Sequence, residues 1–444
     1  MSLSSVLHRR HFLRAGAVGL GVSVSGWMNA LTQAAEAAKK KPQKAVILLW
    51  MNGGPSTIDL WDLKPGHENG GPYKAIKTNA PGLEIGEHLP GIAKFGDKLA
   101  VLRGMSTKEG DHGRATFLMR TGNLPVGGIQ FPSIGPMMAK ELGDPTNELP
   151  NCVSIAPQRF FNVDAFGSGF LGPKYAPLNV ADNVGQQVGQ PNQPAQNLDQ
   201  LLKVQNLDRP EDVSKEHAEA RLELLKQMQE DFAGSRPGGI SAGHGAAYDR
   251  ATRLMLSQGG KAFDLTEEKD GTRDQYGRTL FGQGCLLARR LVERGVAFIE
   301  VSLGNWDTHQ NNFDLVKLLS GQLDKAWSAL MGDLKDRGLL DSTLMVWMGE
   351  FGRTPKINPS KGRDHFPNAW ATVLAGAGIK GGQAIGKTSK DGTTVEERPT
   401  TTIDLLATAC QAIGIDYKKQ NMSNVGRPIR MVDQAADPVK EVLS

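Results

Sequence analysis

Residues 280–301 read LFGQGCLLARRLVERGVAFIEV and decide the expected fold of this chain. Apolar residues recur at three- and four-residue spacing over 280–292, which predicts a helix with one buried face, and Gly295 ends it. The apolar run VAFIEV at 296–301 follows directly and predicts a strand. A helix that leads at once into an apolar strand is the repeating unit of an α/β protein.

The same unit recurs along the chain. A second helical stripe over 315–334 leads to the apolar run TLMVWM at 343–348, and the run KAVILLW at 44–50 precedes a Gly-Gly-Pro turn. A short strand near 372–374 and a helix at 402–413 complete the pattern. These alternating elements predict a three-layer α/β fold, in which helices cover both faces of a mostly parallel sheet.

The composition is that of a globular protein. The chain has 444 residues, of which 22% are charged and 39% apolar. The net charge of +4 arises from the first forty residues, so the rest of the chain is neutral. A neutral chain without a basic block gives no electrostatic reason to expect nucleic acid as a partner. Cys152, Cys285 and Cys410 are far apart, and the last two lie in apolar helical patterns, which predicts core packing rather than a disulfide framework.

The N-terminal segment has the pattern of an export signal. Arg9-Arg10 is followed by a short, Gly-rich apolar run that is too short to span a membrane, and small residues near Ala35 offer a cleavage site. The segment resembles a twin-arginine signal. We therefore expect a signal peptide over residues 1–38, the twin-arginine translocase as a partner during export, and a mature chain in the periplasm or cell envelope without a stable membrane span. The alternative is a solvated basic tail.

The rest of the chain is expected to form one main domain over residues 39–435, followed by a C-terminal tail at 436–444. A loop rich in Gln, Asn and Pro at 185–200 and long helical patterns over 211–256 indicate a mostly helical insertion at about 160–275.

Polar residues that suit chemistry follow several predicted strands. Parallel strands present their carboxyl ends at one edge of a sheet, where ligands bind in open α/β folds. We therefore expect one site at this edge, with the following candidates: Asn52, His112, Asp307, His309, Glu350, Arg353, Asp364 and His365.

Metal binding is the chemistry that these residue types favour. Asp307 and His309 are two positions apart, so an extended segment places both side chains on the same side, where a carboxylate and an imidazole suit Zn²⁺ or Mn²⁺ better than Ca²⁺. Two arginines, Arg353 and Arg363, have the paired donors that hold a phosphate or sulfate group. Each residue also has a structural alternative, as a helix cap or an ordinary ion pair.

Several motifs resemble one bacterial family. The segments NGGPSTIDLWDLKP, WDTH, GEFGRTP and GRDHFP are similar to domain of unknown function 1501, a family grouped by fold with alkaline phosphatases and sulfatases. The resemblance spans essentially the whole mature chain. The resemblance implies a metal site, but Asn52 stands where the superfamily has a metal-binding Asp. His112 falls at the place of the nucleophile, and Glu350-Phe351 replaces an Asp-His pair. His365 matches the last histidine ligand.

Together these observations predict an exported, metal-dependent hydrolase of phosphate or sulfate esters, which acts on an anionic small-molecule or glycan ester. The cofactor would be a divalent metal, either zinc, manganese or calcium. His112 would act as covalent nucleophile, metal ligand or general acid, and Arg353 would hold the anionic group. The expected metal ligands are Asp307, His309, Glu350, Asp364, His365 and Asn52.

Other interpretations remain open at this point. Ser56, Thr57 and Ser106 lie near the ends of early strands and are alternative nucleophiles, although ordinary turn chemistry also explains them. A non-catalytic envelope protein that binds glycans or anions is the main alternative function, since no Ser, Thr or Cys occupies the nucleophile position clearly. A structural envelope component with buried ion pairs is the third.

Overall fold

The computed structural model describes residues 43–182, 198–207, 209–235 and 239–444. The described chain belongs almost entirely to one compact unit, Lys44–Ser444. The signal peptide predicted over residues 1–38 lies outside the described residues, as does most of the loop at 185–200. Within the described part, no helix is both long and apolar enough to cross a membrane.

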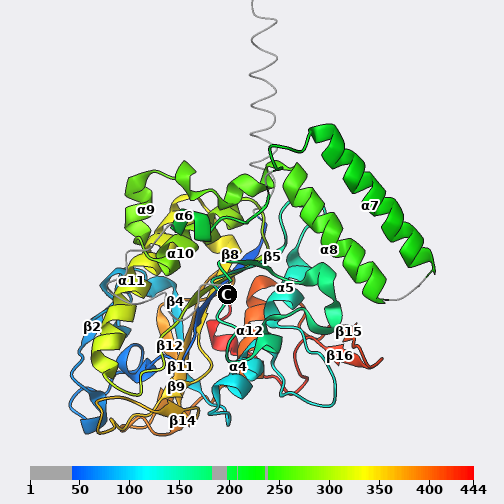
Figure 1. The fold of residues 1–444 in the computed structure, drawn as a ribbon. Helices are drawn as coiled ribbons and strands as arrows, with labels where there is room; N and C mark the ends of the chain where they lie inside the picture. The colour runs from blue at the N-terminus through cyan, green and yellow to red at the C-terminus, as the bar shows by residue number, and fades with distance from the viewer. Residues whose placement is uncertain (1–42, 183–197, 208, 236–238) are drawn as a thin grey trace, which may run out of the picture. The chain divides into compact units, whose positions relative to one another are not determined.

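An eight-stranded sheet forms the centre of this unit (Figure 1). The strand order is β12-β4-β11-β8-β1-β7-β5-β6. The strands are β1 (Ala45–Met51), β4 (Leu99–Met105), β5 (Cys152–Ile155), β6 (Leu178–Val180), β7 (Phe298–Leu303), β8 (Thr343–Met348), β11 (Trp370–Gly376) and β12 (Gln383–Ile385).

The predicted fold class is confirmed. Five neighbouring strands, from β8 through β1, β7 and β5 to β6, pair in parallel. β12 also runs parallel to β4, whereas β11 is antiparallel to both β4 and β8. The sheet is therefore mostly parallel with one reversed strand.

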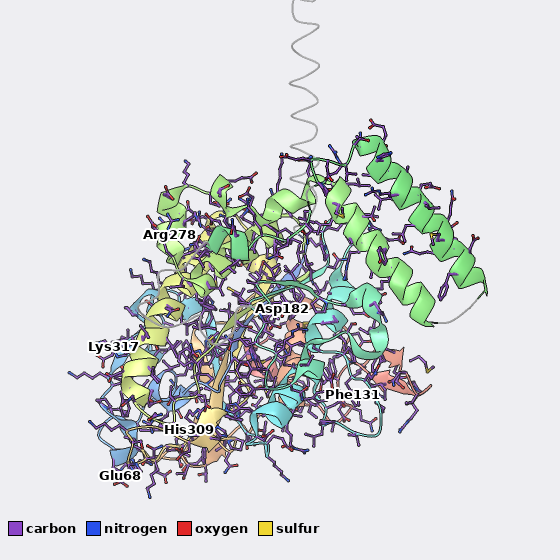
Figure 2. All side chains as sticks on the ribbon, in the orientation of Figure 1. Glu68, Phe131, Asp182, Arg278, His309 and Lys317 are labelled. Carbon is purple, nitrogen blue, oxygen red and sulfur yellow. The ribbon has the colours of Figure 1, made fainter. Side chains whose placement is uncertain are left out.

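Helices cover both faces of the sheet, as the apolar strands require (Figure 1). Every residue of β1 is buried, because alternate side chains enter two different cores. Ile47 and Leu49 pack with residues of α10 (Leu280–Glu293) and α11 (Asn312–Asp336). Leu48 and Trp50 pack with residues of α5 (Ile134–Leu142) and α12 (Thr402–Ile413). Side chains fill the space between the sheet and these helices (Figure 2).

Two helices, α4 (His112–Thr121) and α12 (Thr402–Ile413), begin at residues whose side chains cap them. α4 starts after Asp111, whose side chain accepts a hydrogen bond from the amide of Arg114, and ends at Gly122 in the left-handed conformation. α12 begins with a capping box between Thr401 and Asp404. The α-helices are α3 (Pro90–Ala93), α4 (His112–Thr121), α5 (Ile134–Leu142), α6 (Leu198–Leu201), α7 (Lys215–Ser235), α8 (Gly239–Leu256), α9 (Asp270–Tyr276), α10 (Leu280–Glu293), α11 (Asn312–Asp336) and α12 (Thr402–Ile413).

The region assigned to a helical insertion contains α6 to α9, but it also contributes β6 to the edge of the central sheet. The residues assigned to a tail, 436–444, include a short 3-10 helix, and Val439 and Val442 are fully buried against the sheet's second core. Four two-stranded ladders complete the fold: β2 (Ala75–Lys77) with β3 (Glu84–Gly86), β9 (Gly352–Arg353) with β10 (His365–Phe366), β13 (Lys387–Thr388) with β14 (Val395–Glu397), and β15 (Gln420–Met422) with β16 (Pro428–Arg430).

Candidate metal centre

Four segments that are far apart in the sequence meet at the carboxyl ends of the parallel strands. The turn after β1 supplies Gly53, and the segment after β7 supplies Asp307 and His309. Glu350 follows β8, and His365 lies on β10, which pairs with β9. The N-terminus of α4, which follows β4, contributes the fifth side chain, that of His112.

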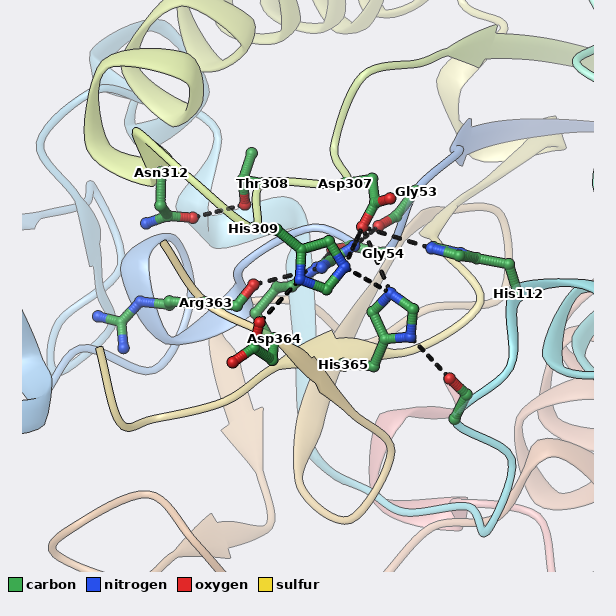
Figure 3. A network of polar contacts seen from close by, with 12 residues as sticks. Gly53, Gly54, His112, Asp307, Thr308, His309, Asn312, Arg363, Asp364 and His365 are labelled. Carbon is green, nitrogen blue, oxygen red and sulfur yellow. Dashed lines mark hydrogen bonds and ion pairs between the residues drawn. The ribbon is translucent and has the colours of Figure 1, made fainter. Parts of the chain in front are cut away.

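Three imidazoles converge on one carboxylate oxygen at this edge (Figure 3). The Nε2 atoms of His112 and His365 each lie 3.4 Å from Oδ1 of Asp307, and Nε2 of His309 lies 3.0 Å from the same oxygen. The Nε2 atoms of His309 and His365 are 2.9 Å apart. Within the described chain, His112, Asp307 and His365 form the group whose ligand atoms lie close enough to share a metal ion. His309 adjoins this group directly.

The opposite nitrogen of each imidazole already has an acceptor. Nδ1 of His365 lies 2.8 Å from the carbonyl oxygen of Gly110, which can only accept, so this nitrogen carries the proton. Nδ1 of His112 lies 2.6 Å from Oε1 of Glu350, and Nδ1 of His309 lies 2.7 Å from Oδ1 of Asp364. These contacts hold the three rings with Nε2 toward Asp307, in the way that outer acceptors orient metal-binding histidines.

Glu350 is completely buried and contacts His112 rather than Asp307. Its Oε1 also accepts a hydrogen bond of 2.9 Å from the amide of Gly53. Its Oε2 is buried and has no hydrogen-bond partner among the described residues. The structure therefore places Glu350 behind His112, one contact away from the converging nitrogens.

Asn52 and Asp364 occupy similar outer positions. The Asn52 side chain is buried, accepts a hydrogen bond of 3.1 Å from Nε1 of Trp50, and donates one of 3.3 Å to Gln158. Asp364 is exposed and contacts Nδ1 of His309. Asp364 thus joins the cluster through His309, while Asn52 contacts Trp50 and Gln158.

Arg353 faces the interior of the protein. Its Nε donates to the carbonyl of Gly54 at 2.8 Å, and its Nη2 donates both to the carbonyl of Gly53 and to Oδ1 of Asp307. Its side chain is fully buried. The buried guanidinium thus links the carbonyl groups of the turn after β1 to the carboxylate of Asp307.

The structure corrects the expectation that Arg363 holds an anion. Its guanidinium forms a bidentate, fully buried ion pair with Asp59, with separations of 2.9 and 2.8 Å. Asp59 also accepts hydrogen bonds from Asn312 and, at 2.6 Å, from the hydroxyl of Ser56. Ser56, one of the alternative nucleophiles, is therefore part of a structural network.

The charges of the cluster shift the pKa values of its members. Burial alone would lower the pKa of His112, but its contacts with Asp307 and Glu350 outweigh burial and raise the pKa to about 9. Burial alone would raise the pKa of Asp307, yet hydrogen bonds from His112 and His365 and the charge of Arg353 hold it far below its usual range. The Asp307 carboxylate is therefore ionised at any physiological pH.

Two features of the site have no clear signal in the sequence. The ring of Phe161 stacks in parallel on His112, with centroids 4.1 Å apart and an angle of 1° between the planes. The carbonyl of Gly110 orients His365. Both depend on loop conformations that no periodic pattern encodes.

The fold and the site together define an α/β protein with a candidate metal centre of histidines and an aspartate at the carboxyl edge of its sheet. The family model of DUF1501, a protein family of unknown function, matches residues 43–443, so the chain belongs to this family. No curated protein matches the chain.

Several solved structures are similar to this chain. A sulfatase from Pseudoalteromonas sp., PsFucS1, shares 14% identity with a TM-score of 0.39 over 86% of this chain and 70% of that one. A protein in the alkaline phosphatase superfamily from Vibrio parahaemolyticus shares 11% identity with a TM-score of 0.39, over 85% and 68% of the two chains. The lipoteichoic acid synthase LtaP from Listeria monocytogenes shares 9% identity with a TM-score of 0.38, over 88% and 75%.

Proposed function

We propose that this protein is an exported, metal-dependent hydrolase of phosphate or sulfate esters, with the metal held by His112, His309, His365 and Asp307. The observation that carries the proposal is the convergence of three Nε2 atoms on Oδ1 of Asp307. Export rests on the twin-arginine pattern at the N-terminus of the sequence.

The distances to Oδ1 of Asp307 fit the spacing of a small tetrahedral site, whereas His309 lies outside the group whose ligand atoms are all within 4.8 Å of one another. Zinc–ligand bonds of about 2.0–2.1 Å place neighbouring ligand atoms about 3.3 Å apart in a tetrahedron. The two separations of 3.4 Å, from His112 and His365 to Asp307, match this spacing. The contacts of 3.0 and 2.9 Å made by His309 are slightly shorter.

The donor set also accommodates a cation. The Nε2 atoms of His309 and His365 lie 2.9 Å apart, a separation that either a proton in a hydrogen bond or a bound cation makes favourable. Three imidazoles and one carboxylate suit zinc or manganese better than calcium, which prefers six or more oxygen ligands.

Other residues of the site hold the three imidazoles and the Asp307 carboxylate in the orientation that metal binding requires. Glu350, Asp364 and the carbonyl of Gly110 hold the rings, and Arg353 holds Asp307 and offsets its charge. A divalent cation at this point supplies Lewis acidity, which polarises an ester oxygen and lowers the pKa of water. The raised pKa of His112 means that cation binding must displace a proton, so affinity rises with pH.

One observation favours a second candidate, a binding protein that holds anionic glycans without cleaving them. The nucleophile position carries His112, whose Nε2 lies in the cluster rather than apart from it. The hydroxyl of Ser56 is engaged with Asp59. In this case the metal would bind the anion and no covalent step would follow.

Metal analysis combined with ester hydrolysis tests the proposal. The protein is purified after export, its metal content is measured, and hydrolysis of aryl phosphate and aryl sulfate is assayed for wild type and His309→Ala. We expect one tightly bound metal and turnover in the wild type, and loss of both in the variant. His217→Ala, a change on exposed α7, is the matched control and should leave both unchanged. Metal without turnover supports the binding protein, and a wild type that takes up neither Zn²⁺ nor Mn²⁺ removes the metal site.

A further inference from the structure

The segment between β5 and the next 3-10 helix is held rigidly against the candidate metal centre. It starts at Ala156, which adopts a positive φ of 51° and whose amide donates to the carbonyl of Val180 at 2.8 Å. Near its other end, the side-chain amide of Asn162 donates to the carbonyl of Gly113 in the first turn of α4 at 3.1 Å. Gln158, between these points, accepts the hydrogen bond from Asn52. The segment 156–163 is therefore fixed at three points.

This segment carries two adjacent phenylalanines to the edge of the site. The ring of Phe161 stacks on the imidazole of His112, and the ring of Phe160 lies 4.3 Å from that of Phe161, tilted by 54°. Phe160 is 52% exposed although it is a large apolar side chain. A continuous series of ring contacts thus leads from the converging nitrogens to solvent.

The polar side of the site is also open. The side chains of Asp307 and His309 are 40% and 43% exposed, whereas that of His112 is only 11% exposed because Phe161 covers it. A ligand at the candidate metal centre therefore meets the exposed polar side chains of Asp307 and His309 on one side and exposed aromatic surface beside His112. A small inorganic anion would use only the first of these two surfaces.

We propose that Phe160 and Phe161 form a subsite for the alcohol portion of the substrate, and that this portion is a ring with an apolar face, either an aryl group or a pyranose. The proposal rests on the proposed function and names the substrate class for the same site. Aromatic side chains bind flat apolar surfaces through offset or edge contacts. Because segment 156–163 is fixed before a ligand arrives, the ordering cost of such binding is small.

The Phe160→Ala variant tests the subsite without disturbing the candidate ligands. Hydrolysis of p-nitrophenyl and glucose-6 esters is compared with hydrolysis of the ethyl ester of the same acid, which has no ring. We expect KM for the ring esters to rise about three- to tenfold, as loss of one aromatic contact implies, while KM for the ethyl ester stays unchanged. The p-nitrophenyl and glucose arms show which kind of ring is preferred. Val163→Ala, at a 62% exposed position of the same segment, is the matched control and should change neither.

Calorimetric titration of the same esters keeps the subsite testable apart from catalysis. If no ester is cleaved, the proposed hydrolase function fails, yet Phe160→Ala should still weaken binding of the ring esters selectively. Equal effects on ring and ethyl esters, or no effect on either, would overturn the subsite. Metal content equal to that of the wild type confirms that the substitution has left the metal centre intact.

Discussion

Replacing Glu350 with glutamine should weaken metal binding without abolishing it. The carboxylate is fully buried and its Oε1 accepts hydrogen bonds from Nδ1 of His112 at 2.6 Å and from the amide of Gly53 at 2.9 Å. A neutral amide retains one acceptor for these two donors and removes the negative charge. His112 is then less firmly held in the orientation that points Nε2 toward Asp307.

The size of the effect follows from the role of Glu350 in orienting His112 at the proposed metal centre. Loss of a carboxylate that orients a ligating histidine typically weakens metal affinity about 10- to 100-fold, or about 1.4–2.7 kcal/mol. The matched comparison is Asp364→Asn, which likewise replaces the carboxylate that contacts His309 with a neutral amide. Since the side chain of Asp364 is 54% exposed, water can replace it, and we expect an effect of only a few-fold.

Competition titration with a zinc chelator at fixed pH measures the zinc affinity of Glu350→Gln and of Asp364→Asn. Thermal unfolding of the metal-free variants confirms that they fold. An affinity in Glu350→Gln equal to that of the wild type would refute the orienting role. Complete loss of stoichiometric binding would instead show that Glu350 is itself a ligand, as the sequence pattern suggested. A larger effect from Asp364→Asn than from Glu350→Gln would contradict the argument from burial.

Three further predictions concern the frame of the site and the stability of the fold. Asp59→Ala leaves the buried guanidinium of Arg363 unpaired and should lower the free energy of unfolding by about 3–5 kcal/mol, as measured by urea denaturation. Glu268→Gln removes the negative charge that pairs with the two buried arginines of α10, at 2.8 and 2.7 Å, and should cost about 1–3 kcal/mol at pH 7. Burial raises the pKa of Glu268, but the two arginines outweigh burial and lower the pKa below 4.5. The stabilisation is therefore present above pH 4.5 and is lost as the pH falls through the folded pKa. If the difference in unfolding free energy between wild type and Glu268→Gln grew in acid, this pH dependence would be contradicted. Gly53→Ala places a Cβ 2.5 Å from the backbone nitrogen of Asp307 at a φ of +111° and should reduce both stability and metal content. Gly66→Ala, at a φ of +79° with no atom within 4 Å, shows the cost of the backbone conformation alone, so similar metal loss in both variants would exclude the steric cause.

Much of the fold follows from local patterns in the sequence. The strand expected at 343–348 and the helix expected at 402–413 have the observed bounds, because each is a buried element with a sharp start and stop. The short strands β5 and β6 were not expected. β5 has only four residues, and its burial depends on pairing with β7, which no local period shows.

The site was predictable as a set of residues but not in its roles. The expectation that ligands bind at the carboxyl ends of parallel strands assigned His112, Asp307, His309 and His365 to one site. The structure places all four side chains within one cluster. Sequence spacing does not show that Glu350 contacts His112 and the amide of Gly53 rather than Asp307, since this depends on side-chain direction within a buried turn. The pairing of Arg363 with Asp59 joins positions over three hundred residues apart, so the sequence alone suggested an anion-binding arginine.

X-ray absorption at the metal edge of the zinc-loaded protein tests the account most directly, because it reports the atoms bound to the metal. We predict one zinc per chain with three imidazole nitrogens and one carboxylate oxygen at about 2.0–2.1 Å. Asp307→Asn should weaken this binding, and His112→Ala should reduce the imidazole contribution to two. A spectrum of the wild type with oxygen ligands only, or one that is unchanged by His112→Ala, would contradict the proposed centre.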